Sequence, residues 1–263
     1  MKTVRKEGIP ASEVIVAEAL AEIGLTSEDF TPDVVRQNFN SLLRAAFTTT
    51  LEVLERYEKQ AYGRLMIEKL LELKQEDIAE VSARTFDCNS SEEKLQEEMA
   101  FLFDRWYEHL RQMFLSISQS RKARGGKDFE LQIGALLDLI EVPFQKKKRT
   151  HRVDFMIPSD DAFEKNRSRA LIVSAKRTLR ERWREVVEEL YSMRAPNVYL
   201  ATADEDVAES HVKAVCRDYN IHLVVWDELK ATKYAGENLV ISYSVLANEI
   251  IPVFKQFWGM GEE

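Results

Sequence analysis

The residues best suited to chemistry lie in the second half of the chain. Asp154 occurs in a short apolar stretch, and Lys176 directly follows the apolar run Ala170–Ala175. Two glutamates, Glu188 and Glu189, come next on an expected helix. Carboxylates hold divalent metals such as Mg²⁺, and a lysine beside them can orient a water and stabilise the charge on a phosphate. These residue types predict a metal-dependent site that hydrolyses a phosphodiester bond.

The second acid of such a site is displaced from its usual position. Many nucleases of this architecture carry an acid two residues before the lysine, where this chain has Ser174. The candidates that remain are Glu188 and Glu189 on the following helix and Glu130 on the helix before the strands. Glu189 lies beside the apolar stripe of its helix, so it is oriented toward a cleft more readily than Glu188. The alternative is that the glutamates after Lys176 form a solvated acidic face.

A sheet is needed to bring these side chains together. Apolar runs predict four strands, at residues 152–158, 170–175, 198–201 and 221–226. Helical patterns accompany them at residues 127–140, 180–193, 207–219 and 243–257. Strands that alternate with helices predict an α/β fold with a mixed, partly parallel sheet flanked by helices. The segment 159–169 is expected to be a polar, flexible loop.

The first part of the chain is expected to be entirely helical. Helical periodicity covers residues 11–25, 34–73 and 92–116, and Thr31-Pro32-Asp33 is typical of a helix start. A basic, glycine-containing stretch at residues 120–126 then interrupts the pattern. We therefore expect a helical region at residues 1–117, for dimerisation and DNA contacts, and a nuclease domain at residues 118–263.

Charge is distributed unevenly along the 263 residues. The net charge is −8, but residues 118–185 contain 17 Lys and Arg against 10 Asp and Glu. This asymmetry is compatible with a basic face for an anionic partner or with an uneven solvated surface. No apolar run is long enough to span a membrane, and the charged first ten residues are not a secretory signal. Cys88 and Cys216 have no metal-ligand spacing, which favours buried thiols in the cytoplasm.

Together these motifs resemble a known group of nucleases. Ser174-Ala175-Lys176 with Asp154 upstream and a displaced glutamate is similar to the PD-(D/E)XK restriction endonucleases that recognise CCGG, CCNGG or CCWGG, such as the EcoRII catalytic domain, SsoII, PspGI and NgoMIV. The most specific elements are the basic stretch 120–127 with Glu130, and Lys176 followed by Arg180-Glu181-Arg182-Trp183. The chain departs from the pattern at Val153, where the group has proline.

The resemblance implies a role for individual residues. Asp154 and Glu189 would be Mg²⁺ ligands, Lys176 the catalytic lysine and Glu130 an auxiliary catalytic acid. Roles in DNA binding would fall to base-reading residues (Arg180, Glu181, Arg182 and Gln119) and to backbone-binding residues (Arg121, Lys122 and Arg124). Arginine donors match guanine O6 and N7, and a glutamate matches the cytosine amino group.

The resemblance also implies a homodimer on double-stranded DNA, with each subunit cutting one strand of a CC…GG palindrome and leaving 5′ overhangs. A site of CCNGG or CCWGG type is preferred to CCGG. Several relatives extrude the central base pair between an arginine and an aromatic residue. Core packing is the favoured role for each aromatic, but three pairs could do this here: Arg44 with Phe47, Arg36 with Phe39, and Arg56 with Tyr57. The alternative functions are a structure-specific repair nuclease and an inactive DNA-binding protein of the same fold.

Overall fold

The computed structural model describes residues 8–25, 30–71, 92–146, 153–179 and 183–259. Its contacts divide the chain into two compact units, one of residues 1–11 and 52–124 and the other of residues 12–51 and 125–263. The boundary expected between residues 117 and 118 falls inside helix α6 (Glu92–Leu139). The division into a dimerisation region and a nuclease domain therefore stays a prediction. None of the described helices is long and apolar enough to cross a membrane.

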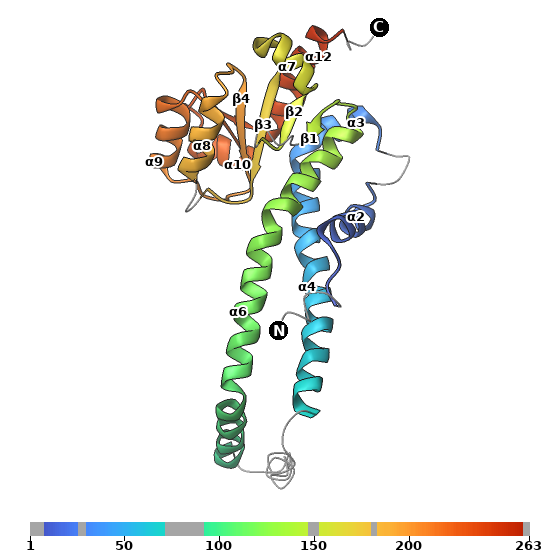
Figure 1. Ribbon diagram of the computed structural model, residues 1–263, viewed down its shortest axis with the longest axis vertical. Coiled ribbons are helices and arrows are strands. Elements are labelled where there is room, and N and C mark those ends of the chain that lie inside the picture. Colours follow the sequence, from blue (N-terminus) through green and yellow to red (C-terminus); the bar gives the residue numbers. More distant parts are fainter. Residues whose placement is uncertain (1–7, 26–29, 72–91, 147–152, 180–182, 260–263) are drawn as a thin grey trace. The chain divides into compact units, whose positions relative to one another are not determined.

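The described part of the first unit consists mainly of two helical segments (Figure 1). These are residues 52–71 of α4 (Phe39–Leu71) and residues 92–124 of α6. Glu58 is buried and accepts three hydrogen bonds of 2.6–3.2 Å from the Arg121 guanidinium. The ion pair therefore joins the two segments.

Helix α6 also corrects one expectation from the sequence. The stretch 120–126 does not interrupt the helix, because α6 continues through it to Leu139. Two adjacent glycines cost a helix about 1 kcal/mol each relative to alanine. Ser120 and Gly125 are buried in this stretch, and tertiary packing can offset a cost of that size.

The second unit is built on a six-stranded mixed sheet in the order β1-β2-β3-β4-β5-β6. The strands are β1 (Gln145–Lys146), β2 (Phe155–Ile157), β3 (Leu171–Lys176), β4 (Val198–Thr202), β5 (His222–Val225) and β6 (Val240–Ser242). The first three pair antiparallel, and β3 to β6 pair parallel. The expected mixed α/β sheet is confirmed. The short strands β1 and β6 were not expected from the sequence.

Strand β3 is buried on both faces, which explains why consecutive positions from Leu171 to Val173 are apolar. Leu171, Val173 and Ala175 belong to the core cluster that includes buried residues of α4, α6 and α12 (Ile251–Phe257). Ile172 belongs to the opposite cluster, with Val187 and Leu190 of α8 (Trp183–Ser192). Side chains alternate along a strand, so Ser174 and Lys176 continue the face of Ile172, the face covered by α8.

The second unit also contains short helices (Figure 1). They are α2 (Ser12–Glu22), α3 (Pro32–Gln37), α7 (Asp160–Lys165), η1 (Arg167–Arg169), α9 (Glu209–Val212), η2 (Lys213–Asp218), α10 (Asp227–Lys233), α11 (Tyr243–Val245) and η3 (Leu246–Ile250). The helix start at Thr31 is confirmed, because its Oγ1 accepts a hydrogen bond from Val34 N. The expectation of a loop at 159–169 is wrong, since Ser159 caps α7 by accepting from Ala162 N at 3.2 Å.

Candidate active site

Asp154 lies opposite Ser174 across the antiparallel pair β2–β3. Phe155 pairs with Val173 in this ladder. Continuing the register by one residue places Asp154 opposite Ser174, so their side chains lie on the same face of the sheet. Its Oδ2 accepts three hydrogen bonds, from Ser174 Oγ at 2.9 Å, Ala175 N at 2.8 Å and Lys176 Nζ at 2.9 Å. The structure thus brings together the aspartate and the lysine that the sequence singled out.

The two oxygens of Asp154 differ in their surroundings. Oδ2 is saturated by the three donors, whereas Oδ1 is buried and has no hydrogen-bond partner within the described residues. The Asp154 side chain is 1% exposed and that of Lys176 is 28% exposed. A buried carboxylate oxygen without a partner is costly unless a cation or water completes it. The oxygen that remains is therefore of the type that binds a divalent metal.

Ser174 has a definite structural role at the position where an acid is usual. Its hydroxyl donates to Asp154, and the residue is 1% exposed. An ionised side chain at this position would place a second negative charge against the buried aspartate. Serine instead supplies a donor, which the sequence alone did not indicate.

Among the described residues, the candidate second acids are not shown in contact with Asp154 and Lys176. Glu189 is partly buried on α8, and Glu188 on the same helix is exposed. Glu130 is partly buried on α6. Within the described ranges, no three His, Cys, Asp or Glu side chains form a group that could hold a metal. The roles of Glu189 and Glu130 as metal-site acids therefore stay predictions.

The predicted base-reading segment, Arg180-Glu181-Arg182, lies outside the described residues. The residue before it is held in place, because Leu179 N donates to Asp204 Oδ2 at 2.6 Å. Asp204 directly follows the buried stretch that ends β4, and Asp204 N donates to Thr202 Oγ1 at 3.2 Å. An acid immediately after a buried parallel strand is the signal that could have identified this tether from the sequence.

The predicted DNA-contacting residues of α6 belong to the first unit. Gln119 and Lys122 are exposed. Arg121 is bound to Glu58, and Arg124 donates to Pro10 O at 2.6 Å and Ile9 O at 3.4 Å. Lys122 has no hydrogen bond or ion pair with any described residue. Among the three backbone-binding candidates, its charge is therefore the most available to a ligand. All of these DNA roles stay predictions.

Two of the arginine–aromatic pairs considered for an extruded base are engaged in the protein. Phe39 is fully buried, and Arg36 pairs with Asp33. Phe47 packs edge-on against Phe129 and Trp226 with ring centroids 6.1 and 6.3 Å apart. Core packing accounts for both aromatics. The described contacts do not select a base-extruding pair.

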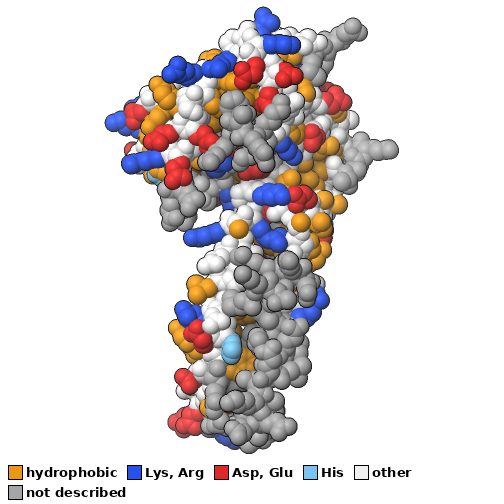
Figure 2. All heavy atoms as spheres, viewed as in Figure 1, with side chains coloured by type: hydrophobic (Ala, Val, Ile, Leu, Met, Phe, Trp, Pro, Cys, Tyr) orange, Lys and Arg blue, Asp and Glu red, His pale blue; other side chains and the backbone are white. Residues whose placement is uncertain are grey.

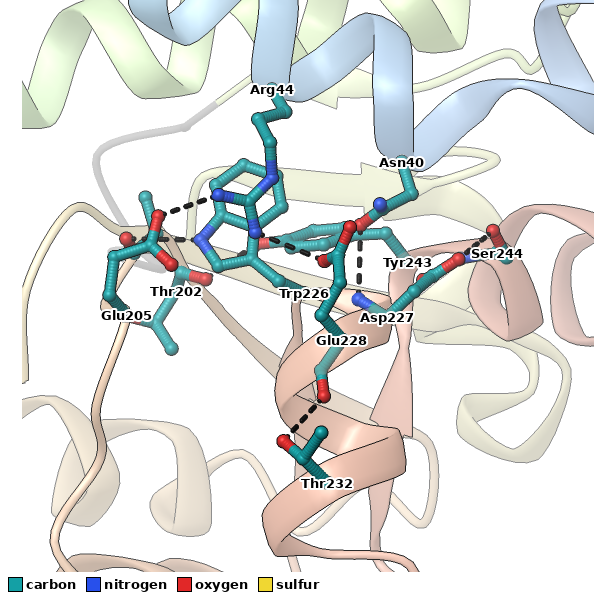
Figure 3. Close-up of polar contacts among 11 residues, drawn as sticks. Asn40, Arg44, Thr202, Glu205, Trp226, Asp227, Glu228, Thr232, Tyr243 and Ser244 are labelled. Carbon is teal, nitrogen blue, oxygen red and sulfur yellow. Dashed lines mark hydrogen bonds and ion pairs between the residues drawn. The ribbon is translucent and has the colours of Figure 1, made fainter.

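Arg44 instead forms a polar cluster at the carboxyl ends of β4 and β5 (Figure 3). Its guanidinium lies 4.5 Å from the Trp226 ring centroid and pairs with Glu205 Oε1 at 2.8 Å and Glu228 Oε2 at 3.1 Å. A hydrogen bond from its own backbone amide lowers the pKa of Glu228, and the charge of Arg44 adds to this.

Two buried aromatic residues make hydrogen bonds at the same edge of the sheet. Trp226 Nε1 donates to Ala203 O at 3.2 Å, and the Tyr243 hydroxyl donates to Thr202 O at 2.9 Å (Figure 3). Burial raises the pKa of Tyr243 well above its ordinary value, so this phenol remains a neutral donor. These bonds fix the segment after β4 that carries Asp204.

On the face of the sheet-containing unit seen in Figure 2, acidic and basic side chains are interspersed. A basic face formed by residues 118–185, one of the two interpretations of the charge distribution, stays a prediction.

Solved structures with a similar fold place the molecule in a structural class. The chain superposes over its whole length on 84% of Ecl18kI in two metal-depleted complexes with uncleaved DNA, with TM-scores of 0.78 and 0.79 and 23% identity. It matches PspGI restriction endonuclease, in a complex with substrate DNA, over 94% of both chains with a TM-score of 0.62 and 21% identity. The fold is therefore the restriction-endonuclease fold, and the expected PD-(D/E)XK-like core is confirmed.

Sequence comparison identifies the family. Residues 84–243 match the family model of the EcoRII C-terminal domain, and the chain belongs to that family. A 146-residue segment is 32% identical to the type II restriction enzyme SsoII of Shigella sonnei. The match covers 51% of this chain and 48% of SsoII, so the chain spans about half the length of this curated relative.

Proposed function

We propose that this chain is a type II restriction endonuclease that cuts double-stranded DNA at a CC…GG palindrome of CCNGG or CCWGG type and leaves 5′ overhangs. One observation carries the proposal: Lys176 Nζ lies 2.9 Å from Asp154 Oδ2 while Asp154 Oδ1 is buried without a hydrogen-bond partner in the described structure. Membership of the EcoRII C-terminal family and the likeness to SsoII support the same activity.

The residues present fit a divalent metal, which we propose to be Mg²⁺. Asp154 Oδ1 would be one ligand, and Glu189, whose helix covers the same face of β3, would be the second acid. When bound, the metal would neutralise charge on the phosphate and acidify a water. Glu130 would line the site as an auxiliary acid.

The protein's own residues position the reacting groups. Ser174 and Ala175 N hold the Asp154 carboxylate in one orientation, which leaves Oδ1 available. Lys176 brings a positive charge that would stabilise the phosphate in the transition state and orient the attacking water. Its side chain is 28% exposed, so the ammonium can meet a substrate while it remains bonded to Asp154.

Sequence recognition would come from the segment next to this site. Arg180 and Arg182 would donate to guanine and Glu181 would accept from cytosine. The Leu179–Asp204 bond ties the start of the segment to the carboxyl end of β4, so a mismatched base would disturb the cutting site. A homodimer would read the two half-sites of the palindrome. We place this activity in the cytoplasm.

A digest of plasmid DNA by the purified protein with Mg²⁺, followed by sequencing of the ends, tests the proposal. The expected result is double-strand cleavage at one CC…GG sequence with a fixed 5′ overhang. Asp154→Ala should bind the same sequence without cutting it. Random nicks, or preferential cutting of branched DNA, would contradict site-specific restriction, and cleavage by Asp154→Ala would show that the metal site is misassigned.

A further inference from the structure

Arg177 follows the proposed catalytic lysine and has no polar partner among the described residues. Its guanidinium carbon lies 5.6 Å from the Phe47 ring centroid, and the residue is partly buried. Within the described residues its guanidinium makes no hydrogen bond or ion pair. Arg44 and Arg124, by contrast, each bond to protein oxygens. The five N–H donors of Arg177 are therefore not bound by any described oxygen of the protein.

The backbone of α6 is shaped to accept this arginine. A Cβ at Gly125 would lie 2.5 Å from Arg177 Nη1 and 2.8 Å from Arg177 Cδ, closer than real contacts allow. A Cβ at the next residue, Gly126, would meet nothing within 4 Å. Gly125 is thus needed for the close approach of Arg177, whereas Gly126 is not. The Phe47 ring and the bare backbone of Gly125 together hold the guanidinium in place.

The space inside this contact is too small for a ligand. Phe47, Gly125, Asp128, Gln132 and Arg177 line a cavity of about 10 Å³, which holds at most one water. A larger ligand would therefore reach the guanidinium from solvent and not from inside this cavity.

We propose that Arg177 binds a DNA phosphate next to the phosphodiester bond that is cut. The inference rests on the proposed function. A planar guanidinium matches two phosphate oxygens with parallel hydrogen bonds, and one held in advance by Phe47 and Gly125 loses little conformational freedom on binding. Because Arg177 adjoins Lys176 in the chain, this contact fixes the phosphate backbone against the catalytic lysine.

The first test is DNA binding without cleavage, measured with Ca²⁺ over a range of salt concentrations on a duplex that contains the cut sequence. Each phosphate contact adds about one to the slope of log affinity against log salt. Arg177→Ala should lower that slope by about one and weaken binding about ten-fold. Arg177→Lys should keep the slope and bind more weakly than the wild type.

Arg167→Ala is the matched control. Arg167 also lies over an aromatic ring, 5.2 Å from the Phe163 centroid, but it precedes the amino end of β3 and donates to Met193 O. The variant removes the same charge and should keep the wild-type slope. A wild-type slope in Arg177→Ala, whatever its thermal stability, would overturn the inference.

A pair of glycine variants tests the same contact without changing any charge. Gly125→Ala should displace Arg177 and weaken DNA binding about as much as Arg177→Ala, whereas Gly126→Ala should bind like the wild type. If Gly125→Ala and Gly126→Ala bind DNA equally well, the inference is contradicted. This comparison tests the phosphate contact even if Arg177→Ala does not fold. If the wild-type protein does not cut DNA at a specific sequence, the proposed function itself is wrong. If the wild type cuts specifically but Arg177→Ala keeps the wild-type salt slope, only the phosphate contact is wrong.

Discussion

Replacing Ser174 by alanine should weaken both the fold and the proposed metal site. Ser174 is 1% exposed, and its Oγ donates to the buried Oδ2 of Asp154 at 2.9 Å. The substitution removes one of three donors to a carboxylate that is itself 1% exposed. It leaves the bonds from Ala175 N and Lys176 Nζ in place.

The structure sets the size of the effect. A hydrogen bond to a charged group contributes about 1.5–3 kcal/mol. Since two donors remain on the same oxygen, we expect the free energy of unfolding to fall by about 2 kcal/mol. Ser174 also fixes the rotation of the carboxylate and hence the position of Oδ1. Loss of such a supporting bond typically weakens metal binding 10- to 100-fold, so half-maximal cleavage should require about ten-fold more Mg²⁺.

Urea unfolding and a Mg²⁺ titration of DNA cleavage measure the two effects. Ser192→Ala is the control, because its hydroxyl is exposed and donates to a neutral oxygen, Glu189 O, at 2.6 Å. It should change stability by less than about 0.5 kcal/mol. If Ser174→Ala unfolds like Ser192→Ala and needs no more Mg²⁺ than the wild type, Ser174 does not orient Asp154 as the geometry indicates.

Three further predictions concern stability and reactivity. Arg121→Ala should lower the free energy of unfolding by about 3 kcal/mol in urea titrations, because it leaves the buried Glu58 carboxylate without its partner; an unchanged midpoint would contradict this. Burial lowers the pKa of His222, which stacks on Tyr199, so the folded state binds fewer protons than the unfolded state. Stability should therefore fall as the pH drops below about 6.5, and His222→Phe should flatten that decline in unfolding curves measured across the range. Burial raises the pKa of the Cys216 thiol to about 11, so mass spectrometry should find Cys216 unalkylated in the native protein near neutral pH and alkylated after unfolding.

The sheet was predictable where burial imposes a simple pattern. Residues 170–175 are apolar except for Ser174 because β3 is covered on both faces, and the structure places β3 at residues 171–176. The short edge strand β1 has two exposed residues, Gln145 and Lys146. It carries no such pattern and could not be read from the sequence.

The helices show where local signals and tertiary packing conflict. Two glycines and a cluster of basic residues predicted a break at 120–126, but α6 is continuous there. The missing side chain of Gly125 makes room for Arg177, and this tertiary contact can offset the cost of a glycine in the helix. That reason depends on residues 52 positions apart in the chain and is invisible to a local pattern.

Part of the site could be predicted because chemistry and strand order constrain it together. An acid at the start of one strand and a lysine at the end of its neighbour converge when the two strands pair antiparallel, and Asp154 and Lys176 do so. The position of Glu189 depends on how α8 packs, which residue spacing alone does not fix. Arg177 was missed because a basic residue after a lysine is ordinarily a solvent-exposed neighbour.

The serine at position 174 supports the proposal that the second acid comes from another element. Asp154 and Ser174 face each other across two strands, and the distance between Oδ2 and Oγ is 2.9 Å. Two carboxylates at such a distance cannot both stay ionised at neutral pH without a metal between them. With serine as a donor, Asp154 needs no metal to hold its orientation, and Oδ1 is prepared before DNA arrives. We therefore predict that the missing negative charge comes from the layer over the same face of β3, where α8 carries the partly buried Glu189.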